Sequence, residues 1–360
     1  MAEPILAIGK YEIAELVGSG GMASVYRGKV MGPMGFEKAV AVKVMHDEAA
    51  QDDELVKMFI DEAKLGAMLT HPNIASVLDF GESGGRYWLT MEYVDGPSLA
   101  VLLKANRPKG AGKSKPAMDL DAVGWVTAGI LKALDHAHKL KDSKGKAMGI
   151  VHRDVSPHNV LIDSAGMVKL ADFGIATGTY RSEKTETGIV KGKASYMSPE
   201  QASGGKVDAR TDIYAVGLTM YAMLTGQSPL ADKDSVKIRA AAAKGVAVKD
   251  IDDLNCPEPI KKILRKALAV KAGDRYSDAA KFLVDLKKAI PDLEAKGHKA
   301  LVKLVGKGRQ GTRKSTVISS ASEITPSHSS SGRGLQILIV AAAILLLAGL
   351  VLTMTGTSLP

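Results

Sequence analysis

Residues 150–162 run Ile-Val-His-Arg-Asp-Val-Ser-Pro-His-Asn-Val-Leu-Ile. Within them, Asp154 offers a carboxylate that can accept a proton from a hydroxyl group, and Asn159 offers a neutral oxygen ligand of the kind that completes a Mg²⁺ shell. The two residues flank a proline-containing loop between two apolar runs, and such a loop is rigid enough to direct both side chains at one point. The stretch therefore predicts a loop with a chemical role.

A second polar motif follows closely along the chain. Ten residues after Ile162 stands Asp172, in the Ala-Asp-Phe-Gly motif of residues 171–174. It adds a second carboxylate, followed by an aromatic residue and a flexible glycine. Two carboxylates and an amide on adjacent loops suit a nucleotide with its metal ions. The alternative, two ordinary polar turns, does not account for the order and spacing of both motifs.

Together these motifs resemble those of the eukaryotic-like (Hanks-type) serine/threonine protein kinases, particularly the bacterial membrane-anchored ones, over residues 11–290. The resemblance implies an α+β fold with the two lobes of a protein kinase. A small lobe at residues 11–94 would hold an antiparallel β-sheet with one helix, and a larger, mainly helical lobe would occupy residues 95–290. It also implies transfer of the γ-phosphate of ATP to Ser and Thr hydroxyl groups of protein substrates, with Mg²⁺, or Mn²⁺ in its place, as the metal.

The composition fits a folded cytoplasmic protein and gives no sign of nucleic-acid binding. The 360 residues are 46% hydrophobic, which is ample for a core. The formal net charge is +9, but only 4% of the residues are aromatic and no nucleic-acid motif is present, so no nucleic-acid partner is expected. The single cysteine, Cys256, excludes an internal disulfide framework, and the first residues lack the basic and apolar regions of a signal peptide.

Residues 11–26 predict a strand, a glycine turn and a second strand. Glycine lets backbone N–H groups approach phosphates, although Ala23 stands where the family has a third glycine. Lys43 ends the apolar run of residues 39–43, and a lysine in an apolar strand is costly unless it is paired. The resemblance makes Lys43 the clamp on the α- and β-phosphates. The nucleotide-binding residues that it implies are Val17, Gly18, Gly20, Val25, Ala41, Lys43, Glu92, Val94 and Leu161.

Residues 51–69 predict a helix, because their apolar residues recur at roughly helical spacing. Glu62 lies among them and is the natural partner of Lys43, the alternative being a solvated helix charge. Two strands are expected to follow, at residues 74–80 and 86–93. The end of the second strand resembles the kinase hinge, in which backbone groups of Glu92 and Val94 would bind the adenine edge.

The resemblance gives a role to each polar residue of the two motifs. Asp154 would orient the substrate hydroxyl and accept its proton, while Asn159 and Asp172 would hold Mg²⁺. Lys43 and Glu62 would position the nucleotide. All five positions carry the expected residue type, which argues for an active enzyme.

Two positions depart from the family pattern. Ser156 stands where serine/threonine kinases typically carry lysine, and Lys193 stands where they typically carry threonine. In the family these side chains meet beside the catalytic aspartate, so the chain exchanges the two groups, and Lys193 is expected to contact Asp154 or the γ-phosphate. The alternative is that Lys193 points to solvent and the chain is a catalytically weak, nucleotide-binding scaffold at the membrane, similar to a pseudokinase.

The segment that precedes Ser198-Pro199-Glu200 is polar and rich in hydroxyl groups. The resemblance makes Thr185 and Thr187 sites of activating autophosphorylation, and it makes Arg153 the cation that a phosphothreonine would pair with. Structural roles are implied for three other residues, with Asp212 as the buried anchor of the catalytic loop and Arg275 as the partner of Glu200.

The composition changes after residue 290. Residues 291–334 are basic and rich in Ser and Thr, which predicts a disordered juxtamembrane linker in contact with anionic lipids. Residues 335–354 are nearly all apolar and uncharged, and a helix of this length spans a bilayer, the alternative being a buried soluble helix. Positive-inside orientation predicts a single-pass protein of the cell membrane with a cytoplasmic kinase domain and a short extracytoplasmic tail at residues 355–360. The sequence leaves the oligomeric state open, with a homodimer as one candidate.

Overall fold

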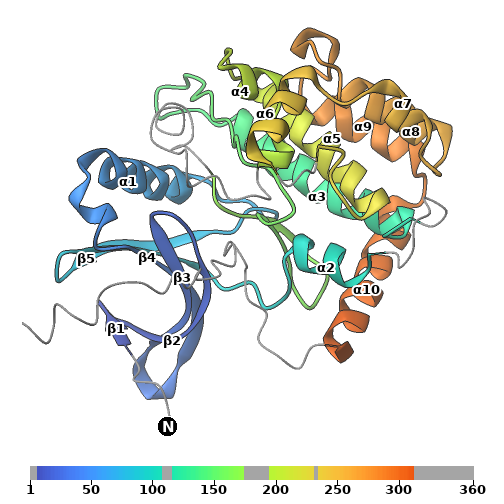
Figure 1. Cartoon of the computed structure of the whole chain (residues 1–360). Coiled ribbons are helices and arrows are strands. Elements are labelled where there is room, and N and C mark those ends of the chain that lie inside the picture. The colour runs from blue at the N-terminus through green and yellow to red at the C-terminus, as the bar shows by residue number, and fades with distance from the viewer. Residues whose placement is uncertain (1–5, 108–115, 174–193, 231–233, 312–360) are drawn as a thin grey trace, which may run out of the picture. The chain divides into compact units, whose positions relative to one another are not determined.

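A computed structural model of the chain describes residues 6–107, 116–173, 194–230 and 234–311. These residues belong to one compact unit, which spans residues 1–322. Within it, a small lobe built on a β-sheet is followed by a larger helical lobe, which is the two-lobed α+β architecture predicted from the sequence (Figure 1).

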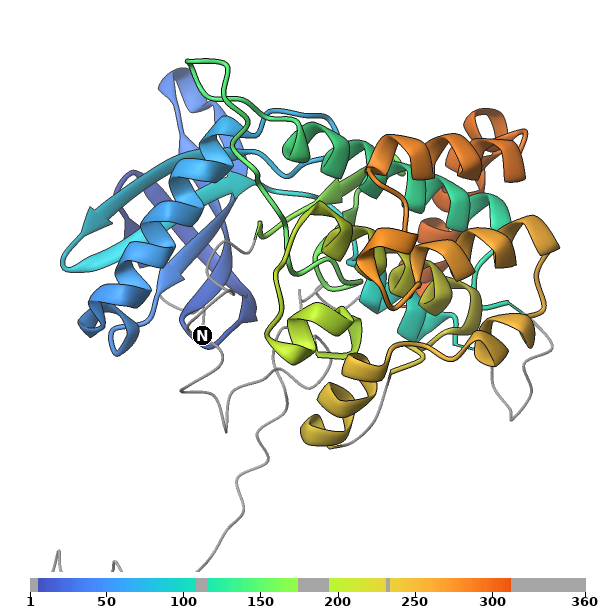
Figure 2. The ribbon, with the colours of Figure 1, turned by 90° about the horizontal axis from the view of Figure 1, so that it is seen from above.

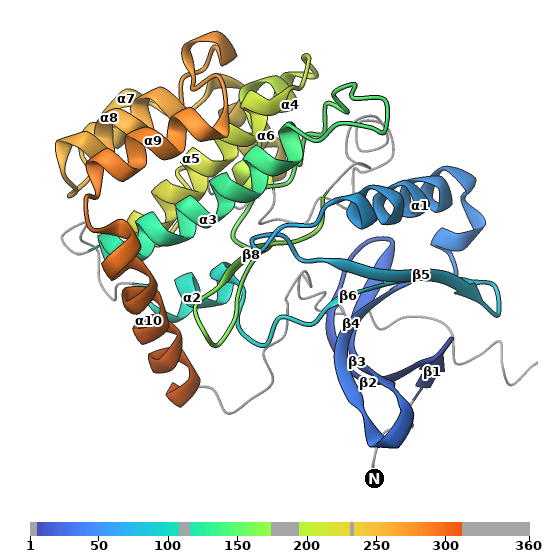
Figure 3. The ribbon, with the colours of Figure 1, turned by 180° about the vertical axis from the view of Figure 1, so that it is seen from behind.

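The small lobe is a six-stranded antiparallel sheet with one α-helix. The strands lie in the order β1-β2-β3-β4-β6-β5, and neighbouring strands are antiparallel throughout. Helix α1 lies against one face of this sheet (Figures 1 and 3). The elements are β1 (Leu6–Ile8), β2 (Tyr11–Ser19), β3 (Ala23–Met31), η1 (Pro33–Gly35), β4 (Glu37–Met45), η2 (Ala49–Gln51), α1 (Asp53–Met68), β5 (Val77–Ser83) and β6 (Arg86–Glu92).

Alternation along β4 sorts its side chains between the two faces of the sheet. Val40 and Val42 lie in the apolar core on the face away from α1. Ala41 and Met45 lie in the other core, which includes residues of α1. Lys43 falls between Ala41 and Met45 in this alternation, so the strand directs it toward α1.

The large lobe is built around α5, which is buried along nearly its whole length. Helix α3 packs against α5, and α9 lies beside α3, as Figures 2 and 3 show. Asp or Ser side chains cap the N-termini of α2, α3, α4, α5, α6 and α9. The elements are α2 (Leu99–Ala105), α3 (Leu120–His138), β7 (Val160–Ile162), β8 (Val168–Leu170), η5 (Ala194–Tyr196), α4 (Pro199–Ser203), α5 (Ala209–Thr225), α6 (Ser235–Lys244), α7 (Val248–Asp252), α8 (Glu258–Ala267), η6 (Ala272–Asp274), α9 (Ala279–Ala289), η7 (Leu293–Gly297) and α10 (His298–Gly311).

The strand predicted at residues 74–80 begins later, at Val77, because the large lobe uses the backbone before it. The Leu170 N–H donates to the Asn73 carbonyl at 2.8 Å, and the Ala75 N–H donates to the Leu170 carbonyl at 2.9 Å. The Asn73 side chain adds a bond of 2.8 Å from its amide nitrogen to the Val168 carbonyl. These bonds join the loop after α1 to β8 and thereby tie the small lobe to the large lobe.

The residues that follow α9 differ from the linker expected from residue 291 onward. They form η7 and α10, and they bury Leu293, Leu301 and Val305 in the core of the large lobe. The many lysines of this segment suggested a linker. Its buried apolar residues, however, recur on one side of a helix, while Lys299 and Lys303 on the other side are exposed. The folded domain therefore continues about twenty residues beyond the expected boundary at residue 290.

Within the described ranges, no helix is both long and apolar enough to cross a membrane. The expected membrane span at residues 335–354, its tail at 355–360 and most of the expected linker lie outside these ranges.

Candidate active site

A buried ion pair joins the sheet to α1. The Lys43 ammonium donates to Glu62 Oε1 at 2.5 Å and lies 3.7 Å from Asp172 Oδ1. Burial disfavours the charged lysine, but the carboxylates of Glu62 and Asp172 outweigh that effect and raise the pKa of Lys43 above its ordinary value. The expected partnership of Lys43 with Glu62 is thus present, and it fixes a positive charge in the cleft.

The loop of residues 151–159 places Asp154 beside Asn159. The Asn159 amide nitrogen donates to the backbone carbonyl of Asp154 at 2.8 Å and to its Oδ2 at 3.1 Å. The Asn159 carbonyl in turn accepts the backbone N–H of Ala171 at 2.9 Å. Asp172 follows directly, with a left-handed backbone (φ 57°) that few residues other than glycine adopt. The two motifs found in the sequence therefore meet at one point.

Asp212 anchors this loop from below, as the first residues of α5 bring it under the catalytic segment. Its carboxylate accepts the backbone N–H groups of His152 and Arg153, each at 2.8 Å, and is fully buried. His138 of α3 donates a third bond at 2.8 Å from Nε2. Arg153 has a left-handed backbone (φ 66°), and these bonds hold it in that strained conformation.

His152 is a neutral structural side chain rather than a proton carrier. Its Nε2 lies 3.1 Å from the Ala171 carbonyl, and its Nδ1 accepts the Asp154 backbone N–H at 3.2 Å. Burial lowers the pKa of His152, and the nearby carboxylates of Asp212 and Asp154 only partly oppose this effect. The imidazole therefore links the two motifs without carrying charge at neutral pH.

An apolar pocket opens between the lobes where the adenine ring was expected. Glu92 and Val94 line it at the connection after β6. This connection passes so close to the backbone of Ile162 that only glycine fits at position 96, because a β-carbon there would lie 2.0 Å from the Ile162 carbonyl oxygen. Gly18 pairs with Val25 across the glycine turn, and the Gly20 N–H closes it on the Ala23 carbonyl at 2.8 Å. The pocket walls include the expected Val17, Val25, Ala41 and Leu161 and also Ala75, Met91, Tyr93, His158, Ala171 and Asp172.

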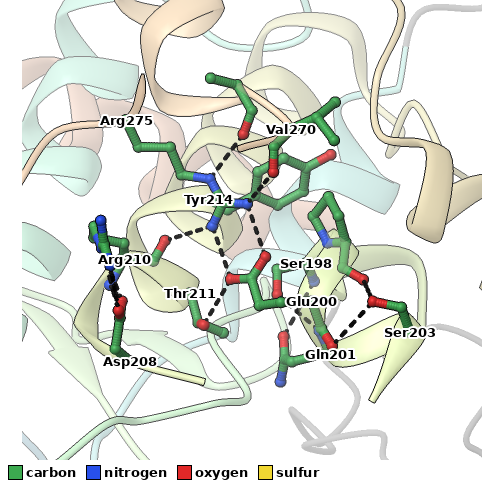
Figure 4. Close-up of polar contacts among 12 residues, drawn as sticks. Ser198, Glu200, Gln201, Ser203, Asp208, Arg210, Thr211, Tyr214, Val270 and Arg275 are labelled. Carbon is green, nitrogen blue, oxygen red and sulfur yellow. Dashed lines mark hydrogen bonds and ion pairs between the residues drawn. The ribbon is translucent and has the colours of Figure 1, made fainter. Parts of the chain in front are cut away.

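A second buried ion pair, between Arg275 and Glu200, holds the start of α4 in place (Figure 4). Arg275 and Glu200 form two parallel bonds of 2.8 Å, and Thr211 donates a further bond of 2.7 Å to Glu200. Burial favours the neutral acid, but the bonds from Arg275 and Thr211 outweigh it and hold the pKa of Glu200 below its ordinary value. Gln201, the next residue, donates to the Arg153 carbonyl at 2.8 Å and so connects α4 to the catalytic loop.

Ser156 is fully buried, and its hydroxyl has no hydrogen-bond partner among the residues that the structure describes. A buried hydroxyl without a partner is unfavourable. Lys193, Thr185, Thr187 and Gly174 lie outside the described residues.

Several residues that support the site were not anticipated from the sequence. His138 completes the shell of Asp212, and Lys169 donates to the Glu92 carboxylate at 2.8 Å, beside the expected hinge. The partners of His138 and Lys169 are far away in the sequence, so the sequence shows that these residues are polar but not which residues they contact. His138 is the last residue of α3, which leads into the catalytic loop.

The donor set of the site fits a hard divalent metal. Asn159 offers an amide oxygen and Asp172 a carboxylate on neighbouring loops, and oxygen ligands of this kind are those that Mg²⁺ prefers. Lys43 stands 3.7 Å from Asp172, where its charge complements phosphate oxygens.

Comparison with known proteins agrees with this geometry. The chain matches the protein kinase domain family over residues 11–286. It is 37% identical over 276 residues to the tyrosine-protein kinase MasK of Myxococcus xanthus (76% of this chain, 42% of that protein). It is 35% identical over 283 residues to the serine/threonine-protein kinase PrkC of Bacillus subtilis (78% and 40%). The chain thus spans about 40% of the length of these curated relatives.

A solved structure supports the same assignment. The crystal structure of the Mycobacterium tuberculosis PknI kinase domain superposes with a TM-score of 0.55 at 28% sequence identity, covering 79% of this chain and 98% of that one. Sequence match, fold and the arrangement of the cleft coincide, and the chain belongs to the protein kinase domain family.

Proposed function

We propose that the chain transfers the γ-phosphate of ATP to serine and threonine hydroxyl groups of proteins. The observation that carries this proposal is the convergence of five polar residues on one cleft. The buried Lys43–Glu62 pair reaches Asp172, and the Asn159–Ala171 backbone bond ties Asp172 to the loop of Asp154. A scaffold that only bound a nucleotide would not need the carboxylate of Asp154.

The residues divide the work as phosphoryl transfer requires. Lys43 would bind phosphate oxygens, and Glu62 would hold Lys43 in place. Asp154 would orient the substrate hydroxyl and accept its proton as the bond to phosphorus forms. Bound Mg²⁺, held by Asn159 and Asp172, would neutralise negative charge on the phosphates. The apolar pocket between the lobes would exclude water from the adenine ring.

The test is incubation of the full chain with γ-labelled ATP and Mg²⁺, followed by analysis of the phosphorylated amino acids. We expect phosphothreonine and phosphoserine. Phosphotyrosine alone would overturn the serine/threonine assignment while leaving a kinase, which is an informative outcome because MasK is named a tyrosine kinase. No label at all, with ATP still bound, would favour the scaffold.

We further propose that phosphorylation at Thr185 and Thr187 activates the enzyme. Arg153 supports this proposal, since no ion pair is recorded for its guanidinium within the described residues and a phosphate group would supply one. Replacing both threonines by alanine is expected to lower kcat about tenfold or more, because the segment would lose its charged anchor. The matched control is Ser182→Ala in the same segment, and a double variant as active as this control would contradict the proposal.

The exchange of Ser156 and Lys193 has two possible consequences. We propose that the Lys193 ammonium supports the γ-phosphate or Asp154, in place of the lysine that the family carries at position 156. The buried, unpartnered Ser156 hydroxyl is the observation that allows the alternative, a site weakened into a scaffold. Lys193→Met is expected to lower kcat about 10²-fold, since a charge aimed at the transferring phosphate is lost. Lys191→Met serves as control, and equal rates in both variants would refute the exchange.

Membrane attachment is also a proposal. Residues 335–354 would span the bilayer once, the basic residues before them would lie on the cytoplasmic side, and the kinase domain would act close to the membrane. The support is their length and their lack of charge. Deletion of residues 335–354 should release the protein from membrane fractions, and a deleted form that still floats with membranes would argue against the span.

A further inference from the structure

The turn between β3 and β4 exposes three large apolar side chains. Met31 is 43% exposed, Met34 is 105% exposed and Phe36 is 60% exposed, and none of them joins an apolar core. Isolated exposed apolar residues are common on protein surfaces, but here three stand within six residues of one turn. We call these three residues the apolar tip.

The backbone of the apolar tip is fixed, so its exposure is built in. The Gly32 N–H donates to the Phe36 carbonyl at 2.7 Å, and the Phe36 N–H donates to the Pro33 carbonyl at 3.2 Å. Met34 has a left-handed backbone (φ 56°), a conformation unfavourable for a residue with a side chain. A glycine here would remove that strain, yet the chain carries a large apolar residue that points into solvent.

The end of the folded domain that carries the apolar tip also carries the end of α10. Figures 1 and 3, which share a vertical axis, both show the β3–β4 turn and the C-terminal end of α10 at the lower end of the folded unit. Helix α10 exposes Lys299 and Lys303, and residues 298–311 contain no acidic residue. The apolar tip of the small lobe and the C-terminal end of α10 in the large lobe therefore lie at the same end of the folded domain.

Helix α10 ends on that side, 24 residues before the apolar residues 335–354. The 24 residues from Gly311 to 335 reach at most about 85 Å when extended and about 27 Å on average as a flexible coil. A domain attached in this way stays within reach of the bilayer. Exposed methionine and phenylalanine side chains are of the kind that enters a lipid interface.

We propose that the apolar tip inserts into the interfacial layer of a bilayer, at the end of the domain where α10 ends. This inference rests on the membrane attachment proposed above. A bilayer is the occupant that fits, because three side chains offer far less area than the roughly 800 Å² per partner of a stable protein interface. Lipid needs no complementary pocket. Since the tip belongs to the small lobe, the contact holds that lobe at the membrane.

The experiment places a polarity-sensitive fluorophore at the tip. In a Cys256→Ala background, Met34→Cys is labelled in the full chain and reconstituted into phosphatidylserine-containing phosphatidylcholine vesicles. Emission should shift to the blue and be quenched by brominated lipid. Ser83→Cys, at the exposed turn between β5 and β6, is the matched control and should show neither effect. Adding Met31→Ser and Phe36→Ser to the labelled variant should lower the inserted fraction about tenfold, as two large apolar side chains are lost.

The outcomes distinguish failure of the proposal for the apolar tip from failure of the proposal for the membrane span. Absence of quenching at position 34 in a chain that floats with the vesicles overturns the proposal for the tip and leaves the span intact. If the chain does not float, the span fails, and the same label is then measured after the chain is added to preformed vesicles. Quenching there still supports the tip, and its absence overturns it. A blue shift that appears without lipid and grows with protein concentration would assign the tip to a second copy of the chain.

Discussion

Replacing Asp154 by asparagine is expected to lower kcat about 10²–10⁴-fold, which is the contribution of a positioned general base. Asparagine has nearly the same shape but cannot accept the substrate proton. The main-chain carbonyl at this position would still accept the Asn159 side chain, so the loop should keep its conformation. The measurement is the rate of phosphate transfer to a generic protein substrate, with both proteins at saturating ATP and Mg²⁺.

The affinity for ATP separates a chemical defect from a folding defect in this variant. Asp154 does not line the adenine pocket, so the dissociation constant for ATP should stay within about twofold of the original value. Asp135→Asn, on the outer side of α3 where the carboxylate pairs with Lys139, is the matched control and should leave both quantities unchanged. A wild-type chain no faster than Asp154→Asn, with ATP binding intact in both, would establish the scaffold instead.

The sequence was sufficient for the parts of the site that depend on residue type and order. Asp154, Asn159 and Asp172 lie on two short motifs that stand close together in the sequence, and Lys43 is a charge within an apolar strand. Glu62 followed from its place on the apolar side of a predicted helix. These signals are local, and local periodicity is what a sequence shows directly.

What could not be predicted depends on contacts between distant segments. The bond from His138 to Asp212 and the bond from Lys169 to Glu92 leave no periodic trace. The late start of β5 has the same origin, because hydrogen bonds to β8 take the backbone before it. Helix α10 was missed because its many lysines suggested a linker. Its apolar residues are spaced so that they lie on one side of the helix, and that side is buried.

Replacing Arg275 by glutamine is expected to lower the free energy of unfolding by about 3–5 kcal/mol, because Glu200 would keep a buried charge without a counter-ion. The Arg275 side chain is 0% exposed and that of Glu200 is 15% exposed. The three guanidinium nitrogens donate to the Glu200 carboxylate and to the carbonyls of Ala269, Arg210 and Val270. Glutamine reaches too few of these acceptors. Urea titration of both proteins measures the difference.

Arg265→Gln is the matched control for this substitution. Arg265 also contacts two carboxylates, those of Asp252 and Glu258, but it does so at the surface, where solvent screens the charges, so little change is expected. In the double variant Glu200→Gln with Arg275→Gln, the buried charge is gone, and stability should recover part of the loss. A double variant less stable than Arg275→Gln alone would mean that the carboxylate of Glu200 still stabilises the fold without its arginine.

The pH dependence identifies the charge as the cause. In the wild type the pKa of Glu200 lies below its ordinary value of 4.5, so its stabilising contribution is complete above that pH and is lost as the pH falls through the lowered pKa. In Arg275→Gln burial acts without the arginine and should raise the pKa of Glu200. Protonation of Glu200 in acid then removes its buried charge and reduces the loss of stability in the variant. As the pH falls, the stability gap between the two proteins should therefore begin to narrow above pH 4.5, where Glu200 of the variant takes up its proton, and it should go on narrowing through the lowered pKa of the wild-type Glu200. A gap that stays constant with pH would assign the loss to packing instead, since Arg275 also covers the Tyr214 ring at 4.7 Å.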